Sequence, residues 1–98
     1  MKKADHSVDR QAISDFQQIV NVGPACAEDF RVLGFETPQE LIGRDPLELY
    51  RTLCQKTGVR HDPCVLDVLM ATVDFMIGNA PKKWWKYTKA RKEKYGKI

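Results

Sequence analysis

The sequence predicts an all-α protein with one small domain. Apolar residues recur at helical spacing along most of the chain, and no segment alternates apolar and polar residues as a strand does. Three predicted helices begin with a capping side chain followed by proline, at Thr37-Pro38, Asp45-Pro46 and Asp62-Pro63. The length of 98 residues and the hydrophobic fraction of 43% suit a single core. We therefore expect a compact domain of about five helices, followed by a basic and helical tail.

The first two predicted helices are joined by a tight turn. Residues 8–20 carry apolar side chains at helical spacing and form the first helix. Residues 24–33 form the second, which begins at a proline that suits the first helical position. Between them, Asn21 and Gly23 are residue types that tolerate positive φ easily, and we expect them at the bend. Val22 lies between these two positions and can point inward as an apolar anchor.

Three further helices follow, each with a marked start. Residues 38–42 form a short helix and residues 46–57 a longer one, and each is ended by a glycine. Residues 63–77 form the longest helix, and its wide apolar face predicts that it is the core helix. This face carries Val65, Leu66, Leu69, Met70, Val73, Met76 and Ile77.

Charge is distributed unevenly and separates a domain from a tail. Residues 1–81 carry eight Lys/Arg and twelve Asp/Glu, a net charge of −4. Residues 82–98 carry eight Lys/Arg and one Glu, a net charge of +7. A basic tail on an acidic body is typical of polyanion binding, although a solvated end that keeps a protein soluble has the same composition.

The tail begins with two adjacent tryptophans, Trp84 and Trp85. Neighbouring helical residues point about 100° apart, so these two cannot share one face. One stripe holds Trp84, Tyr87 or Thr88, Arg91 and Tyr95, and another holds Trp85, Lys89 and Lys92. The favoured interpretation is that one tryptophan packs on the domain and the other is half exposed. The alternatives are stacking on single-stranded nucleic acid, or a protein interface that includes a homodimer through both tryptophans.

The turn before the second helix can bind an anion. The first amides of a helix lack intrahelical partners, and the helix dipole adds positive charge there. We expect phosphate contacts from these amides and from the tail. The predicted nucleic-acid-binding residues are Asn21, Val22, Gly23, Ala25, Lys82, Lys83, Lys86, Lys89, Arg91, Lys92 and Lys94. Glu28 and Asp29, expected in the first turn of the second helix, oppose phosphate binding, and a purely structural turn is the alternative.

This turn resembles the helix-hairpin-helix motif of DNA-binding and DNA-repair proteins. Val22 matches the apolar residue of that motif, Gly23 its second glycine and Ala27 its small helical residue, whereas Asn21 stands where the first glycine is usual. The resemblance implies contact with the nucleic-acid backbone without base reading. It also departs from the usual pattern, because Ala25 and Cys26 stand where DNA-binding members carry Lys or Arg.

A wider combination of segments covers residues 8–87. It comprises Val22-Gly23-Pro24, Leu33-Gly34-Phe35, Asp45-Pro46-Leu47-Glu48-Leu49-Tyr50, Asp62-Pro63-Cys64-Val65-Leu66 and Pro81 with Trp84-Trp85-Lys86. Together they are similar to a family of small helix-hairpin-helix proteins labelled pathogenicity-locus or mitomycin-resistance-type. The resemblance implies one compact helical domain and a role near damaged DNA.

Patterns for catalysis and metal binding are scarce. Asp67 and Asp74 lie seven residues apart on the core helix, where we expect a solvated face. Cys54, His61 and Cys64 lack the spacing of a zinc site, and three cysteines suit reduced, buried thiols. No apolar run approaches the ~20 residues that span a bilayer, and no signal peptide is recognisable.

These observations favour a cytoplasmic, non-enzymatic protein without cofactor, metal or membrane partner. We expect it to contact DNA, single-stranded DNA included, through the turn and the tail without sequence specificity. The alternative is a protein-interaction module in which the hairpin is purely structural.

Overall fold

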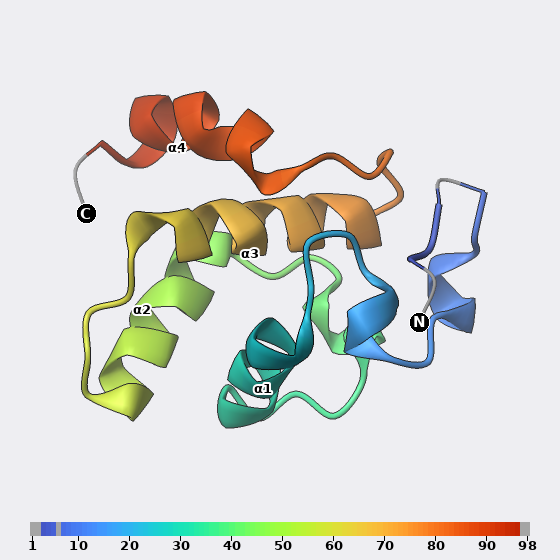
Figure 1. Ribbon diagram of the computed structural model, residues 1–98, viewed down its shortest axis with the longest axis horizontal. Coiled ribbons are helices and arrows are strands. Elements are labelled where there is room, and N and C mark those ends of the chain that lie inside the picture. The colour runs from blue at the N-terminus through green and yellow to red at the C-terminus, as the bar shows by residue number, and fades with distance from the viewer. Residues whose placement is uncertain (1–2, 6, 97–98) are drawn as a thin grey trace.

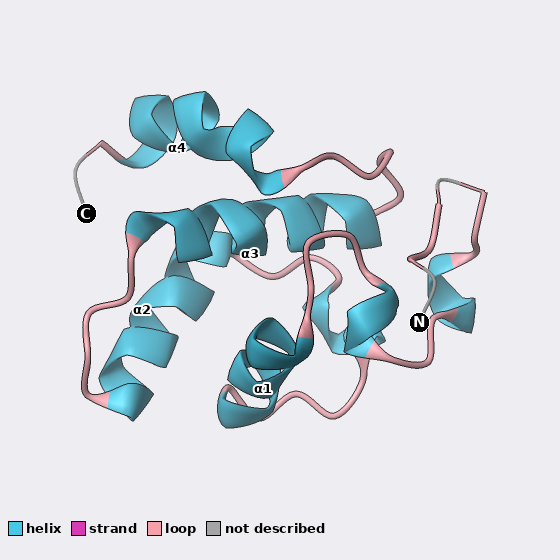
Figure 2. Cartoon of the chain, in the orientation of Figure 1, coloured by secondary structure: helices cyan, strands magenta, loops and turns pink. Residues whose placement is uncertain are grey.

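The computed structural model describes residues 3–5 and 7–96, and in these residues all regular secondary structure is helical (Figures 1 and 2). The predicted all-α fold is confirmed. The α-helices are α1 (Pro24–Val32), α2 (Pro46–Thr57), α3 (Pro63–Met76) and α4 (Thr88–Tyr95). The 3-10 helices are η1 (Arg10–Ala12), η2 (Phe16–Gln18), η3 (Pro38–Leu41) and η4 (Trp84–Tyr87).

Helix α3 runs through the middle of the molecule, with α4 along one side and α2 and α1 on the other (Figure 1). Eight of its residues are buried, which confirms it as the core helix. The largest fully buried apolar side chains are Ile13, Ile19, Val22, Phe30, Leu41, Leu53, Leu66, Leu69, Phe75 and Met76. In the described part of the chain, no helix has the length and apolar character needed to cross a membrane.

The helix starts marked by a capping residue and proline form as predicted. The side chains of Asp45 and Asp62 accept hydrogen bonds from the amides of Leu47 and Cys64, each at 3.0 Å. The bond from the Cys64 amide lowers the pKa of Asp62. Helix α2 ends at Gly58, which adopts φ +72°. These ends are encoded locally, because each depends on residues a few positions apart.

The predicted helix over residues 8–20 is wrong. The segment forms only η1 and η2, because Ser14, Asp15 and Gln18 bond locally in a way that competes with a continuous helix. The Gln18 side chain accepts from the amides of Ser14 and Asp15 at 2.8 and 2.9 Å, and Asp15 accepts from the Gln17 amide. The freed Ile13 carbonyl accepts from the Gln39 amide group at 2.6 Å. The turn at 21–23 therefore joins a 3-10 turn to α1, so a hairpin between two α-helices is not confirmed.

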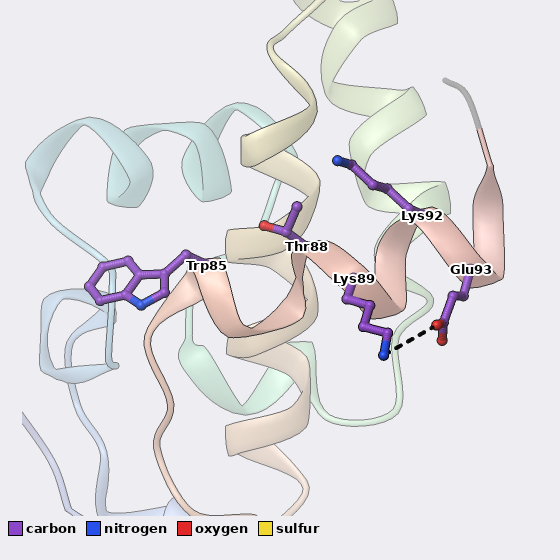
Figure 3. A pocket seen from close by; sticks show the side chains of 5 residues that line it. All are labelled: Trp85, Thr88, Lys89, Lys92 and Glu93. Atoms are coloured by element: carbon purple, nitrogen blue, oxygen red, sulfur yellow. Dashed lines mark ion pairs between the residues drawn. The ribbon is translucent and has the colours of Figure 1, made fainter.

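The C-terminal segment has two different faces, one of which packs on α3 while the other is exposed. Arg91 is buried and Trp84, Tyr87, Thr88 and Tyr95 are partly buried, whereas Trp85, Lys89 and Lys92 are exposed. Figure 3 shows this outer face of α4. The predicted stripes and the predicted difference between the two tryptophans are confirmed.

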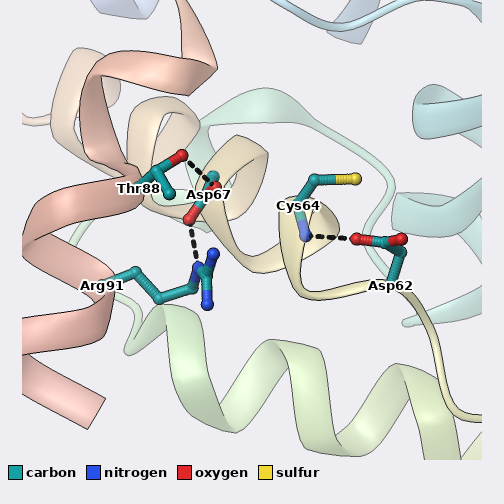
Figure 4. A network of polar contacts seen from close by, with 5 residues as sticks. All are labelled: Asp62, Cys64, Asp67, Thr88 and Arg91. Carbon is teal, nitrogen blue, oxygen red and sulfur yellow. Dashed lines mark hydrogen bonds and ion pairs between the residues drawn. The ribbon is translucent and has the colours of Figure 1, made fainter. Parts of the chain in front are cut away.

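The inner face of α4 is held by Asp67, which was expected to be solvated and is fully buried. Arg91 Nε donates to Asp67 Oδ1 at 2.6 Å, and Thr88 Oγ1 donates to Asp67 Oδ2 at 2.7 Å (Figure 4). Asp74, two helical turns further along α3, accepts a hydrogen bond from the Tyr87 hydroxyl at 2.6 Å. Burial and this hydrogen bond raise the pKa of Tyr87. Ile77 was expected in the core and is exposed, because α3 ends at Met76.

We predict that Asp67→Ala lowers the free energy of unfolding by about 3–5 kcal/mol, because it leaves the Arg91 guanidinium buried without a counter-charge. Urea denaturation followed by circular dichroism measures this change. The exposed pair of Lys89 and Glu93, 4.0 Å apart, provides the control, and Glu93→Ala should change stability by less than about 0.5 kcal/mol.

The double variant Asp67→Leu/Arg91→Met removes both charges and should recover most of the lost stability. A loss below about 1 kcal/mol for Asp67→Ala alone would show that the pair behaves as a surface contact and does not hold α4.

Candidate nucleic-acid interface

The turn before α1 is shaped by Asn21. Asn21 has φ +69°, and among the described residues it is the one non-glycine with positive φ. Gly23 has φ −101° and ψ −170°, which is extended backbone that any residue adopts. The expectation of a bend at Asn21 is confirmed, and that of positive φ at Gly23 is wrong. Val22 is fully buried as an anchor, and its amide donates to the Ile19 carbonyl at 3.1 Å. The Val22 amide is therefore not a phosphate donor.

The N-terminus of α1 carries no side-chain cap. Gly23 stands at the N-cap position and has no side chain to offer, and Pro24 has no amide hydrogen. Ala25 follows at the second helical position and is exposed. A Cβ atom on Gly23 would meet no other atom within 4 Å, so neither packing nor backbone conformation requires glycine here. The Ala25 amide thus lies at an open, positively polarised helix end.

Glu28 does not oppose an anion at this position as strongly as expected. Glu28 and Asp29 are the fifth and sixth residues of α1, so the expectation that they lie in its first turn is wrong. The Glu28 carboxylate is 3.2 Å from Arg31 Nη1, and both side chains are largely exposed. The acidic charge therefore lies one turn away from the helix end and is partly compensated.

Asn21 also fastens the start of the C-terminal segment to the turn. Its Nδ2 donates to the Lys82 carbonyl at 2.9 Å, and its Oδ1 accepts from the Trp84 amide at 3.2 Å. We call these two bonds the Asn21 clamp. The clamp ties the backbone at the start of the tail to Asn21, three residues before the first residue of α1. The two features that the sequence suggested separately are thus linked through the turn.

A third lysine joins this surface from the N-terminal segment. Lys3 Nζ donates to the Gln17 carbonyl at 2.7 Å and to the Val22 carbonyl. Burial lowers the pKa of Lys3, and the positive charge of Lys83 acts in the same direction. Cys26 and Asp15 act in the opposite direction. Lys3 adds a positive charge to the turn through its bonds to the Gln17 and Val22 carbonyls.

The remaining basic residues lie along the tail. Lys82, Lys83, Lys86, Lys89, Lys92 and Lys94 are exposed and can reach solvent anions. Arg91 is buried against Asp67, so we exclude it from the predicted contacts. A shallow pocket of about 510 Å³ on the outer face is lined by Trp85, Thr88, Lys89, Lys92 and Glu93 (Figure 3).

Sequence reasoning missed Asn21 and Asp67 as joining residues. For Asp67 a signal existed, since an acidic residue on the most apolar helix lies 24 positions before an arginine on the inner stripe of the tail. For Asn21 the signal concerned only its backbone. Among the described residues, no group of three His, Cys, Asp or Glu side chains is placed to hold a metal ion. Burial raises the pKa of Cys26 to about 12, which keeps this thiol protonated.

The fold and this surface define a small all-helical protein whose helix end and cationic tail are joined. Residues 9–93 match the protein family described as "Pathogenicity locus", and the chain belongs to this family. A similar protein is the mitomycin resistance protein McrB of Streptomyces lavendulae. The two are 42% identical over 79 residues, which cover 81% of this chain and 75% of the relative. No solved structure matches the chain. The family resemblance expected from the sequence is confirmed.

We predict that Gly23→Ser raises the free energy of unfolding by a few tenths to about 1 kcal/mol. A serine at this extended position can cap the open amides and restricts the unfolded chain. Gly34→Ser is the matched control, because Gly34 has φ +93° and a side chain there is strained. It should cost about 1–2 kcal/mol. Denaturant titration of both proteins measures the difference, and equal losses would contradict the extended conformation of Gly23.

Proposed function

We propose that this protein binds the DNA backbone without reading sequence and performs no chemistry on it. The open amides at Gly23 and Ala25 donate hydrogen bonds to one phosphate, and the exposed tail lysines supply most of the affinity. The proposal extends to a role in resistance to mitomycin, which rests on the name of the relative from Streptomyces lavendulae and on family membership.

The observation that carries this proposal is the Asn21 clamp. A basic tail alone is often only a solvated end, and an uncapped helix end alone is often only a turn. The clamp ties the start of the tail to the turn before α1 through hydrogen bonds of 2.9 and 3.2 Å. We propose that a phosphate near Ala25 then contacts the oriented amides and the Lys82 and Lys83 charges together. Oriented backbone donors and nearby cations are how proteins position a nucleic-acid backbone.

The charge pattern supports sequence-independent binding. Six tail lysines are exposed, whereas Arg91 is already neutralised by Asp67. If all six contact phosphates of duplex DNA, log affinity should fall with log salt concentration at a slope of roughly −5.

We predict that Ala25→Glu weakens DNA binding several-fold at low salt, and that the loss shrinks at high salt. A carboxylate in the first turn repels phosphate, yet it stabilises the helix by about 0.3–1 kcal/mol through the dipole. Lower affinity with equal or higher stability excludes unfolding as the cause. Fluorescence anisotropy with a labelled duplex and denaturant titration measure the two quantities.

Gln55→Glu is the matched control, since it adds the same charge at an exposed position in the last turn of α2. In cells that depend on the protein for mitomycin survival, Ala25→Glu should reduce survival and Gln55→Glu should not. Unchanged DNA affinity in Ala25→Glu would show that no phosphate of the DNA binds at the N-terminus of α1.

We further predict that Lys82→Gln/Lys83→Gln reduces the salt slope for duplex DNA by roughly 2, because each lysine contributes about one released counterion. Arg51→Gln/Lys56→Gln removes two exposed charges from α2 and should leave the slope unchanged. Removal of the whole tail is a poorer test, because it would strand Asp67 without Arg91. Equal slopes for the two double variants would argue against clamp-directed binding.

The second candidate function is a protein-interaction module, and one observation favours it. Ile42 and Ile77 are exposed apolar side chains. Together with Val8 and Met76 they line a second shallow pocket, of about 410 Å³ and distinct from the one at Trp85. Exposed apolar surface of this kind is typical of a docking site. If Ala25→Glu and the tail lysine variants leave DNA affinity unaltered, this candidate replaces the first.

A further inference from the structure

Trp85 is the one exposed aromatic side chain in the described part of the chain. Its relative exposure is 56%, whereas the four phenylalanines and Tyr50 are buried and the other aromatic residues are partly buried. Solvent exposure of an indole forgoes a large apolar stabilisation. The neighbouring Trp84 takes the packing role instead. Packing within this protein therefore does not explain why a tryptophan stands at position 85.

The indole of Trp85 extends from a rigid part of the backbone. The backbone amide of Trp84 donates a hydrogen bond to the Asn21 side chain, and the Thr88 hydroxyl donates one to Asp67 at 2.7 Å. Both bonds fix the backbone on either side of Trp85. The Thr88 amide closes η4 on the Trp85 carbonyl. The rings of Trp84 and Trp85 meet edge to face, with centroids 5.7 Å apart and an interplanar angle of 83°. The indole is thus preorganised, and a ligand that stacks on it does not have to order it first.

Two ammonium groups accompany the indole in the pocket of the outer face. Lys89 and Lys92 line it and extend to opposite sides of α4, while Trp85 projects from the start of the segment (Figure 3). The side chains of Lys89 and Glu93, 4.0 Å apart, are 88% and 68% exposed, so this pair holds Lys89 only weakly. Both ammonium groups therefore remain available to the phosphates of a strand that passes along this face. An aromatic side chain with cations further along the same face is complementary to a base and to the phosphates that adjoin it.

We propose that Trp85 is a stacking platform for an unpaired base, and that the protein accordingly prefers single-stranded DNA to duplex DNA. This inference rests on the proposed backbone binding and adds the strandedness of the ligand. Bases of a duplex are stacked on one another and offer no free face to an exposed indole, whereas an unpaired base does. The Asn21 clamp ties Trp84, the residue before the Trp85 platform, to the turn that leads into α1. One strand can therefore contact the helix end, the indole and the two lysines in turn.

The test compares three probes of equal length: an oligothymidylate of about 12 nucleotides, an abasic strand that keeps only sugars and phosphates, and a mixed-sequence duplex. Trp85→Ala should weaken oligothymidylate binding by roughly 5- to 100-fold and change binding of the abasic strand and the duplex by less than about twofold. Trp85→Phe should retain most of the affinity. Ile77→Ala, which removes an equally exposed apolar side chain elsewhere, should change none of the three.

Fluorescence gives a second readout that does not need a Trp85 deletion. In Trp84→Phe, Trp85 is the remaining tryptophan of the two in the chain. Its emission should be quenched by the oligothymidylate and not by the duplex or the abasic strand. Equal weakening of the oligothymidylate and the abasic strand in Trp85→Ala, or unquenched emission on oligothymidylate binding, overturns the stacking platform. If Ala25→Glu still weakens all three probes, the proposed function survives that result. If none of the probes binds, both proposals fail.

Discussion

The buried ion pair between Asp67 and Arg91 determines where the C-terminal segment lies. A carboxylate in an apolar core is costly unless a counter-charge and hydrogen bonds compensate it, so Asp67 requires α4 against α3. Thr88 and Arg91, nearly one helical turn apart, use the two oxygens of the same carboxylate. A slide of α4 by one residue would break both contacts. A short and highly charged helix thereby acquires a defined register that its few apolar contacts could not supply.

The Asn21 clamp fastens the same segment at its other end. Its residues 82–84 are tied to the turn before α1, and its residues 88 and 91 are tied to α3. The lysines between and beyond these points project from a fixed backbone. A disordered basic tail loses conformational entropy when it binds, and a docked one loses less. The surface thus combines the charge of a tail with the geometry of a folded site.

The sequence predicted the elements whose signals are local. Helices α2 and α3 begin at Asp-Pro pairs because cap and proline act within one turn. The failed helix over residues 8–20 had the right apolar spacing, but Ser14 and Gln18 bond their own backbone, and periodicity does not register this competition. For the candidate site, the basic tail was predictable from the distribution of charge, and the turn before α1 from the local order of Asn21, Gly23 and Pro24. The contacts that join them, from Asn21 and Asp67, cross 61 and 24 positions and depend on tertiary packing.

The late position of Arg91 in the chain has a consequence for biosynthesis. The ribosome delivers Asp67 well before its partner, so the nascent chain holds a carboxylate on its most apolar helix with nothing to neutralise it. Water must solvate that group until residue 91 has emerged, which keeps α3 from burying its final face too early. Completion of the core is thereby linked to the emergence of Arg91. A nascent chain that stalls before residue 91 retains an open α3 face, which exposes it to the proteases and chaperones that act on unfinished proteins.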